Sequence, residues 1–521
     1  MLLADCYHAK KIGWCFMSKF RFSIILLLTL LVSPLWAAED AEEATHGVEA
    51  AFVQVLDTYE YQGFKVIQFD LGVLAHYSYL LVSEKEALLV DPLRDIKAYL
   101  KAAKDGGFKI TGTFLTHNHA DFVAGHLEAA KELGAPIYIS DKAGVGFEHR
   151  ALNEKSELKV GKAVLRFLAT PGHTPESMVC LVYGTKSKET PEVMFTGDTL
   201  FIGSVGRPDL MGGSISAASL ASMMFDSWNK KLKPLADSIH VLPAHGAGSL
   251  CGAGLSDDPI STLGEQKTNN PYVQYQSRSE FVAAILDGLP QAPQYFGHNA
   301  AMNKKGPALV QWEKLPPVTT PKESLSKDAS KVVIDLRHAV EYAAGHIPNS
   351  INVALRGRLE TWVGIMVPWG KAVYVVGNEV LQKEAVRRLH RIGYTVKGRL
   401  QFNDWKKAGL PVATNVRIKP LELHQKLKEG TAPIIVDVRL PKEWMADRIG
   451  TVVNLPLNKL AEGANKLDKS QPVVAVCNSA FRSSLAIGIL EREGFTKVGS
   501  LAGGGKAWKK AGLPMIQSKV A

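Results

Sequence analysis

The chain has 521 residues, too many for a single hydrophobic core, and this length predicts roughly three or four domains. Its 46% apolar and 21% charged residues are typical of an ordinary globular protein. The formal net charge of +10 comes from Lys and Arg that are spread along the sequence. A nucleic-acid-binding protein usually gathers its basic residues on one patch, so we expect no nucleic-acid partner.

The N-terminal segment has the layout of an export signal. From Met17 onward, two basic residues precede an apolar run at 22–32, and the small residue Ala37 comes before an acidic stretch. The apolar run is too short for a comfortable membrane span. We therefore predict an export signal over residues 1–38, with translation starting at Met17, cleavage near Ala37, no stable membrane anchor and a periplasmic or secreted mature protein. An uncleaved anchor is the competing interpretation.

Polar residues of the kinds that bind metals follow several apolar, strand-like runs between residues 110 and 250. The segments "HNHADF", "ATPGHTPES", "FTGDTLF" and "LPAHGAGS" supply six candidate ligands: His117, His119, Asp121, His173, Asp198 and His245. Because loops that follow the strands of one sheet collect at its edge, we expect these side chains to converge on a metal ion. The spacing alone leaves His119 and Asp198 as alternatives for the third ligand.

Over roughly residues 48–250 these segments resemble the metallo-β-lactamase fold, which implies an αβ/βα sandwich. Dinuclear zinc hydrolases of this fold carry His-x-His-x-Asp-His, whereas this chain has Phe122 at the last of these positions. The second metal position has therefore lost an imidazole, and this loss disfavours a two-zinc centre.

The remaining residues can supply two imidazoles and one carboxylate with open positions, the facial triad that suits Fe(II) and oxygen chemistry. The sequence is thus more similar to the persulfide dioxygenases of this fold. That resemblance implies one Fe(II) per chain, bound by His117, His173 and Asp198, with zinc as the alternative metal. It implies ligand-orienting or water-binding roles for His119, Asp121 and His245.

Three more stretches narrow the resemblance to persulfide dioxygenases that carry fused rhodanese domains. They are residues 197–210, residues 245–254 and a linker-like segment at 295–307. Within the first stretch, Arg207 either binds an anionic group of the substrate or pairs with Asp209.

Three cysteines remain after removal of the signal, and their wide spacing does not indicate a disulfide framework. Cys180 lies in an apolar, strand-like run, and we expect it to be a packing residue. Cys251 lies in a glycine-rich loop, where it either relays sulfur near the mouth of the metal site or is a small buried residue. The third, Cys477, belongs to a repeat in the C-terminal part of the chain.

The heptad WKKAGLP occurs at 405–411 and again at 508–514, at the ends of two segments that align with each other. Two Asp–Arg pairs, which we expect to tie a strand to the loop after it, also align: Asp335 with Arg337, and Asp437 with Arg439. Strands that alternate with helices predict α/β domains with largely parallel sheets. We therefore predict a duplicated domain, with a first copy at 322–415 and a second copy at 416–518.

Both copies resemble rhodanese domains, and the loop "CNSAFR" from Cys477 to Arg482 carries the resemblance. A thiol at a strand end that faces the amides opening a helix is favoured as the thiolate. Arg482 would add a positive charge for an anionic group. We expect Cys477 to carry a transferable sulfur as a persulfide. Because the first copy has Gly377 at this position, we predict that it is catalytically inactive and has an architectural role.

Together these features predict an α/β protein, with a metallo-β-lactamase-like domain and its C-terminal extension at 48–320 followed by two rhodanese-like α/β domains. The resemblance implies iron-dependent oxidation of a low-molecular-weight thiol persulfide by O2 to sulfite. It also implies rhodanese sulfur transfer at Cys477 that gives or uses thiosulfate. A glyoxalase-like zinc hydrolase fused to a sulfur carrier is one alternative, and an exported sulfur carrier that oxidises nothing is another. The sequence leaves a homo-oligomer open.

Overall fold

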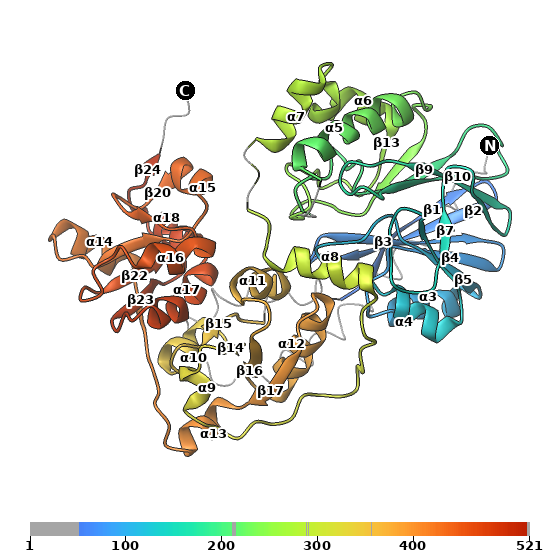
Figure 1. The fold of residues 1–521 in the computed structure, drawn as a ribbon. Coiled ribbons are helices and arrows are strands. Elements are labelled where there is room, and N and C mark those ends of the chain that lie inside the picture. Colours follow the sequence, from blue (N-terminus) through green and yellow to red (C-terminus); the bar gives the residue numbers. More distant parts are fainter. Residues whose placement is uncertain (1–51, 211–214, 288, 290, 356, 518–521) are drawn as a thin grey trace, which may run out of the picture. The chain divides into compact units, whose positions relative to one another are not determined.

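The computed structural model describes residues 52–210, 215–287, 289, 291–355 and 357–517, which form five β-sheets with their covering helices (Figure 1). The predicted export signal at 1–38, including Met17 and Ala37, lies outside the described residues. Within the described residues, no helix is both long and apolar enough to span a membrane.

The N-terminal part is built on two sheets. The first sheet has seven strands in chain order: β1 (Gln54–Tyr61), β2 (Phe64–Leu71), β3 (His76–Ser83), β4 (Glu86–Val90), β5 (Lys109–Phe114), β6 (Ile137–Ser140) and β7 (Arg150–Leu152). Strands β1 to β4 pair antiparallel, and β4 to β7 pair parallel. Every residue of β3 is buried, because this strand is covered on both faces.

The second sheet has six strands in the order β13-β12-β11-β10-β9-β8. Its strands are β8 (Glu157–Val160), β9 (Ala163–Ala169), β10 (Met178–Tyr183), β11 (Val193–Gly197), β12 (His240–Pro243) and β13 (Ser261–Thr262). The inner faces of the two sheets share one hydrophobic cluster, in which Phe114 contacts Phe167 at a centroid distance of 5.2 Å. Cys180 is fully buried in this cluster, as expected of a packing residue.

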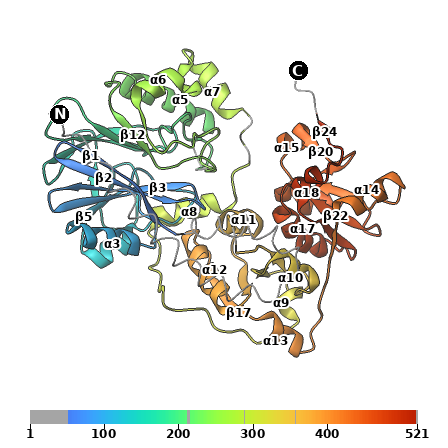
Figure 2. The same cartoon turned by 180° about the vertical axis from the view of Figure 1, so that it is seen from behind.

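Helices cover the outer face of each sheet (Figures 1 and 2). On the first sheet these are α3 (Lys97–Gly106) and α4 (His126–Leu133), whose buried Tyr99 and Ala129 join a cluster with residues of β2, β3 and β4. Around the second sheet lie α5 (Ala217–Ser227), the π-helix η1 (Trp228–Leu232), α6 (Leu263–Asn269), the 3-10 helix η2 (Pro271–Gln274) and α7 (Arg278–Leu286). Their residues, such as Met224, form a separate cluster with the outer face of β10 and β11. The layers are therefore those of the predicted αβ/βα sandwich.

The segment at 295–307, which we expected to be linker-like, is instead largely helical. It contains α8 (Tyr295–Lys305), whose buried face consists of Tyr295, Phe296, Asn299, Ala300 and Asn303. These positions recur with the period of a helix. The expectation of a linker was wrong because two of the five buried residues are asparagines, so the buried face is only weakly apolar in the sequence.

The first copy contains a four-stranded parallel sheet in the order β15-β14-β16-β17. Its strands are β14 (Lys331–Asp335), β15 (Ile351–Asn352), β16 (Ala372–Val376) and β17 (Val396–Leu400), and its helices are α9 (Ser324–Lys327), α10 (Ala339–Ala344), α11 (Leu359–Met366), α12 (Glu379–Arg391) and α13 (Phe402–Lys407).

The second copy repeats this plan with a five-stranded parallel sheet in the order β18-β23-β22-β19-β21. Its strands are β18 (Val416–Ile418), β19 (Ile434–Asp437), β21 (Val453–Asn454), β22 (Val473–Val476) and β23 (Val498–Leu501), with a separate antiparallel pair of β20 (Asp447–Arg448) and β24 (Ile516–Gln517). Its helices are α14 (Pro420–Lys428), α15 (Pro441–Ala446), η3 (Leu457–Lys459), α16 (Leu460–Ala464), α17 (Phe481–Arg492) and α18 (Gly504–Lys510).

The repeated heptad has the same structural role in both copies. The buried indole of Trp405 donates a hydrogen bond to Pro411 O at 2.7 Å, and that of Trp508 donates to Pro514 O at 3.0 Å. The aligned Asp–Arg pairs are also equivalent, because in each copy the Asp carboxylate accepts from the backbone N–H and the guanidinium of the Arg two residues later. These shared residues stabilise the domain, and their repetition reflects duplication of the fold.

The first copy contacts both the sandwich and the second copy. Arg391 forms an ion pair with Asp95 at 2.5 Å, and its backbone carbonyl accepts from Val123 N–H at 2.7 Å. On its other side, His346 lies 2.9 Å from Glu491 of α17. These contacts agree with the architectural role predicted for a copy without a cysteine.

Candidate functional site

Three of the predicted ligands lie together beyond the ends of strands of the sandwich. His117 follows β5, His173 follows β9 and Asp198 follows β11. Their ligand atoms all lie within 4.8 Å of one another. Asp198 Oδ2 is 3.5 Å from His173 Nε2 and 4.0 Å from His117 Nε2, and no side chain of the three is more than 2% exposed.

Hydrogen bonds orient the two imidazoles toward this shared point. Thr116 Oγ1 lies 2.9 Å from His117 Nδ1, and the backbone oxygen of Arg207 lies 2.8 Å from His173 Nδ1. Each ring therefore keeps Nε2 free to face Asp198. Gly206 allows this close approach, because a Cβ atom there would lie 2.0 Å from Asp198 O and 3.1 Å from His173 Nδ1.

A second group of potential ligands, Asp121, His245 and Cys251, adjoins the first. Their ligand atoms also lie within 4.8 Å of one another, and all three residues are buried. His245 Nε2 is 3.6 Å from Asp121 Oδ2 and 3.6 Å from Asp198 Oδ1, so Asp198 lies between the two groups. His245 Nδ1 contacts Ala75 O at 3.0 Å, which directs Nε2 to the centre.

His119 lies beside the three residues but contacts a different carboxylate. Its Nε2 is 3.0 Å from Asp91 Oδ1. Burial alone would lower the pKa of His119, but Asp91 and the carboxylates of the centre raise it above its ordinary value. The Phe122 ring occupies the neighbouring space, with its centroid 4.5 Å from that of His119 and 4.2 Å from that of His76.

The polar atoms of this centre fit a bound divalent metal ion. Among the described residues, both carboxylate oxygens of Asp198, Oδ1 of Asp121 and Nε2 of His245 are buried without a hydrogen-bond partner. Buried carboxylates without donors are costly, and a cation would satisfy them. Burial, followed by the neighbouring histidines, lowers the pKa of His117 well below its usual range, so its ring is neutral, the form that ligates metals. Two imidazole nitrogens and a carboxylate oxygen suit iron or zinc.

The loop that carries His119 and Phe122 is bound to helix α8. Asn303 Nδ2 donates to the backbone oxygens of His119 and Phe122 at 2.7 and 2.8 Å. Its Oδ1 accepts from Ala124 N–H at 2.9 Å. Asn303 is 2% exposed, so these three bonds are shielded from water and hold the loop at a defined place.

Arg207 and Cys251 are both buried, and for Cys251 a small buried residue is one of the two roles that the sequence left open. Arg207 is 2% exposed; Nε and Nη2 donate to Asp209 at 2.7 Å each, and Nη1 donates to Leu250 O at 3.3 Å. Its pairing with Asp209 is thus one of the two roles that the sequence left open. Cys251 is 1% exposed, and burial, with the carboxylates of the metal centre, raises the pKa of its thiol well above the ordinary value.

Cys477 stands at the end of β22, directly before the loop that leads into α17. Its Sγ accepts from Ser483 N–H at 3.4 Å and is only 1% exposed as a residue. Ala480 in this loop has φ = 67°, a left-handed backbone that costs a non-glycine residue roughly 1 kcal/mol. The turn directs the Ser483 amide, in the first turn of α17, to the sulfur.

Arg482 is paired with an acidic side chain of the second copy. Its two terminal nitrogens each donate to a carboxylate oxygen of Glu443 at 2.7 Å. Burial opposes the charge of both groups, but their pairing raises the pKa of Arg482 and lowers that of Glu443. The positive charge predicted to bind an anionic group therefore already has a partner.

The profile of the metallo-β-lactamase superfamily matches residues 71–245, and that of the rhodanese-like domain matches residues 321–405 and 419–511. Over 217 residues the chain is 30% identical to the protein named persulfide dioxygenase ETHE1, mitochondrial, of Mus musculus, with 41% of this chain and 76% of that protein covered. The chain belongs to the metallo-β-lactamase superfamily. Two rhodanese-like domains are fused to its metallo-β-lactamase domain.

Two further similarities concern the same superfamily. The chain is 26% identical over 215 residues to the hydroxyacylglutathione hydrolase GloC of Haemophilus influenzae, with 37% of this chain and 90% of that protein covered. The crystal structure of a metallo-β-lactamase from Staphylococcus aureus superposes with a TM-score of 0.59 at 30% identity, covering 65% of this chain and 99% of that one. These findings, with the observed layers, confirm the predicted fold class.

The first rhodanese-like domain has lost more than its cysteine. Gly377 follows β16 where Cys477 follows β22, and the residues that lead into α12 from there, 377–384, contain no arginine. Gln382 Nε2 donates to the backbone oxygens of Gly377 and Leu400. These two hydrogen bonds close the loop of the first copy, which has no nucleophilic side chain at the position of Cys477.

Sequence reasoning missed three residues of these sites. Asp91 follows the buried strand β4, and the rule that found the other strand-end ligands applies to it as well. Glu443 has an aligned counterpart, Glu341, in the first copy, and the repeat could have drawn attention to it. Asn303 gave no signal, because its three bonds join parts of the chain about 180 residues apart.

Proposed function

We propose that this protein oxidises a thiol persulfide, of the glutathione persulfide type, with O2 at a single Fe(II) bound by His117, His173 and Asp198, and transfers sulfur at Cys477. The buried group of two imidazoles and one carboxylate, joined in one chain to a rhodanese-type cysteine, carries this proposal. The similarity to a relative named persulfide dioxygenase supports it.

The oxidation balances as RSSH + O2 + H2O giving RSH, sulfite and two protons. The S–S bond breaks, the outer sulfur is oxidised by four electrons and O2 accepts them. When bound, the metal would supply a Lewis acid and a common binding point for persulfide anion and O2. The protein provides the surroundings: Thr116 and the Arg207 carbonyl orient the ligands, and the buried residues of the centre exclude bulk water.

Sulfur transfer at Cys477 needs no redox partner. The thiolate attacks the outer sulfur of a persulfide, the S–S bond breaks, and the thiol leaves as Cys477 becomes a persulfide. Sulfite then attacks the outer sulfur and leaves as thiosulfate, which returns the thiolate. Ser483 N–H and the positive end of α17 stabilise negative charge on the sulfur in each step.

Sulfite links the two centres, as product of the first and acceptor at the second. One chain keeps the intermediate at a high effective concentration, on the order of millimolar for short tethers. We also propose that the mature protein is exported, either to the periplasm or out of the cell.

The test is oxygen consumption by the mature protein, from about residue 38 onward, loaded anaerobically with Fe(II) and then given glutathione persulfide. We expect rapid uptake with sulfite formation, and loss of uptake together with iron in the His117→Ala variant. Cys477→Ser should keep the uptake and lose thiosulfate formation. A folded, fully iron-loaded protein that consumes no oxygen would contradict the proposal.

A zinc hydrolase is the second candidate function. The similarity to a hydroxyacylglutathione hydrolase favours it, as does the ligand group of Asp121, His245 and Cys251 beside the first. Hydrolysis of a glutathione thioester by the zinc-loaded protein without oxygen would support this candidate.

A further inference from the structure

The contact between Arg482 and Glu443 joins the catalytic loop to a separate helix. The two residues are 39 positions apart, and the paired nitrogens and oxygens are 2.7 Å from each other at both ends. A bidentate pair of a guanidinium with a carboxylate uses the same geometry that would bind a planar or tetrahedral oxyanion. Glu443 therefore occupies two of the five N–H donors of Arg482, the pair that a sulfur oxyanion would bind in the same bidentate way.

This contact coincides with a closed thiol. Cys477 is only 1% exposed, and Arg482 directly precedes Ser483, whose N–H points to the sulfur. An anionic sulfur compound that binds both terminal nitrogens of Arg482 beside this thiol must first displace Glu443.

The helix that carries Glu443 is weakly held between two fixed ends. Helix α15 has no buried residue, and Leu440 and Met445 are each 48% exposed. On either side of it, Arg439 and Asp447 are paired with each other at 2.8 Å. A helix that buries so little surface can move at small cost while its ends stay in place.

A comparison with the first copy shows which contact of Glu443 is common to both rhodanese-like domains. Glu341, at the equivalent position, accepts from His338 N–H at 3.3 Å, much as Glu443 accepts from Leu440 N–H at 3.0 Å. The carboxylate at the start of the helix is thus common to both copies. Among the described residues, only the copy with a cysteine adds an arginine partner to this carboxylate.

We propose that Glu443 is a specificity-determining residue of the Cys477 site: it holds Arg482 in place of the anionic substrate and must be displaced before a sulfur oxyanion binds. This inference rests on the sulfur transfer proposed above. Substrate and carboxylate compete for one guanidinium, so the site opens for compounds with enough negative charge to replace Glu443. Neutral molecules gain nothing from Arg482 and meet a closed thiol.

The test compares Glu443→Gln with Glu341→Gln in the full mature protein. Both variants remove one charge at equivalent helix starts, but only the first frees an arginine. With thiosulfate as sulfur donor and cyanide as acceptor, which yields sulfite and thiocyanate, Glu443→Gln should lower KM for thiosulfate about fivefold and change kcat less. Glu341→Gln should leave both constants at the wild-type values.

Alkylation of Cys477 gives a readout that does not need turnover. Followed by mass spectrometry of the Cys477 peptide, Glu443→Gln should accelerate reaction with anionic iodoacetate more than reaction with neutral iodoacetamide. Glu443→Asp keeps the charge but shortens the side chain, so its ratio of the two alkylation rates should lie between those of wild type and Glu443→Gln. This variant replaces Glu443→Gln in the test if Glu443→Gln does not fold.

The outcomes separate this inference from the function on which it rests. If wild type transfers no sulfur from thiosulfate, the proposed transfer fails, and the alkylation ratio still decides the role of Glu443. If wild type is active and a folded Glu443 variant keeps the wild-type KM and alkylation ratio, Glu443 does not compete with the substrate and the inference is overturned.

Discussion

Arg207 is held on all sides by groups of the protein itself. Its guanidinium pairs with Asp209 and contacts Leu250 O, while its backbone oxygen orients His173. A buried arginine that loses its carboxylate partner stays charged, and the free-energy cost of burying that charge is then no longer offset. The contacts of Arg207 therefore favour a structural role next to the metal centre over a substrate contact.

We predict that Asp209→Asn destabilises the protein without weakening the binding of substrate. Removing one partner of a buried ion pair lowers the free energy of unfolding by roughly 3–5 kcal/mol. Because the Asp209 side chain is 28% exposed, we expect a loss at or below the lower end of this range. Thermal unfolding measures the loss, with Asp237→Asn, from an exposed pair with Lys267, as the control. A raised KM for persulfide with unchanged Tm would instead show that Arg207 binds the substrate.

Helix α8 connects the metallo-β-lactamase domain with the rhodanese-like part of the chain. Through Asn303 it binds the backbone of the loop at 119–124, next to the metal centre. This helix is the segment expected to be a linker. A short helix that buries two asparagines gains little from apolar burial, so its place depends on hydrogen bonds to its neighbours.

We predict that Asn303→Ala weakens retention of the metal. Without the amide, two carbonyls and one N–H of the loop remain buried and unpaired, and loss of groups that orient ligands commonly lowers metal affinity 10–100-fold. The measurement is the rate of metal removal by a chelator. Asn299→Ala is the matched control, because Asn299 is buried one turn earlier and its amide has no hydrogen-bond partner among the described residues. Equal rates in the two variants would contradict a role of Asn303 in holding the loop.

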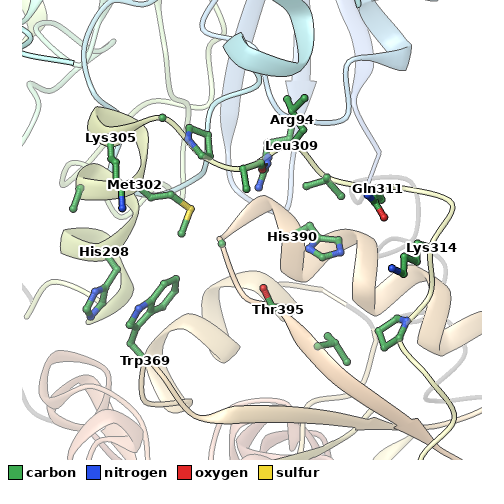
Figure 3. Close-up of a pocket in the computed structure, with 18 of the residues that line it drawn as sticks. Arg94, His298, Met302, Lys305, Leu309, Gln311, Lys314, Trp369, His390 and Thr395 are labelled. Atoms are coloured by element: carbon green, nitrogen blue, oxygen red, sulfur yellow. The ribbon is translucent and has the colours of Figure 1, made fainter. Parts of the chain in front are cut away.

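At the scale of the whole molecule, the segment after α8 and the end of α12 line a pocket together with Arg94 (Figure 3). His390 faces this pocket, and burial, followed by the nearby charge of Arg94, lowers its pKa to about 4. In an unfolded chain a histidine has its ordinary pKa of about 6.5. Between these values the unfolded state binds more protons, so the free energy of unfolding should fall as the pH falls from about 6.5 to about 4.

We predict that His390→Gln flattens this part of the pH dependence. The variant removes the group that takes up a proton only on unfolding, whereas His298→Gln, at an exposed position in the same pocket, should keep the wild-type slope. Denaturant unfolding at several pH values from 4 to 7 measures both. An unchanged slope in His390→Gln would show that His390 is charged in the folded state.

Much of this protein follows from short sequence patterns, because the chemistry they encode is local. The strand-end segments indicated six candidate ligands, from which the resemblance to persulfide dioxygenases singled out His117, His173 and Asp198. The order of strands and helices indicated the α/β class. The duplication was visible in two identical heptads, whose role, an indole bonded to the carbonyl six residues later, also lies within one short segment. The loss of the nucleophile in the first copy needed only Gly377 to be compared with Cys477.

The tertiary structure decided what depends on residues far apart in the chain. It paired Arg482 with Glu443, bound the metal-site loop to Asn303, placed Asp198 between two ligand groups and turned the expected linker into α8. None of these pairings has a sequence signature, because a charged or amide side chain finds its partner only after packing has fixed which segments meet. The sequence by itself determined which groups can do chemistry, and the fold determined which of them are already occupied by the protein.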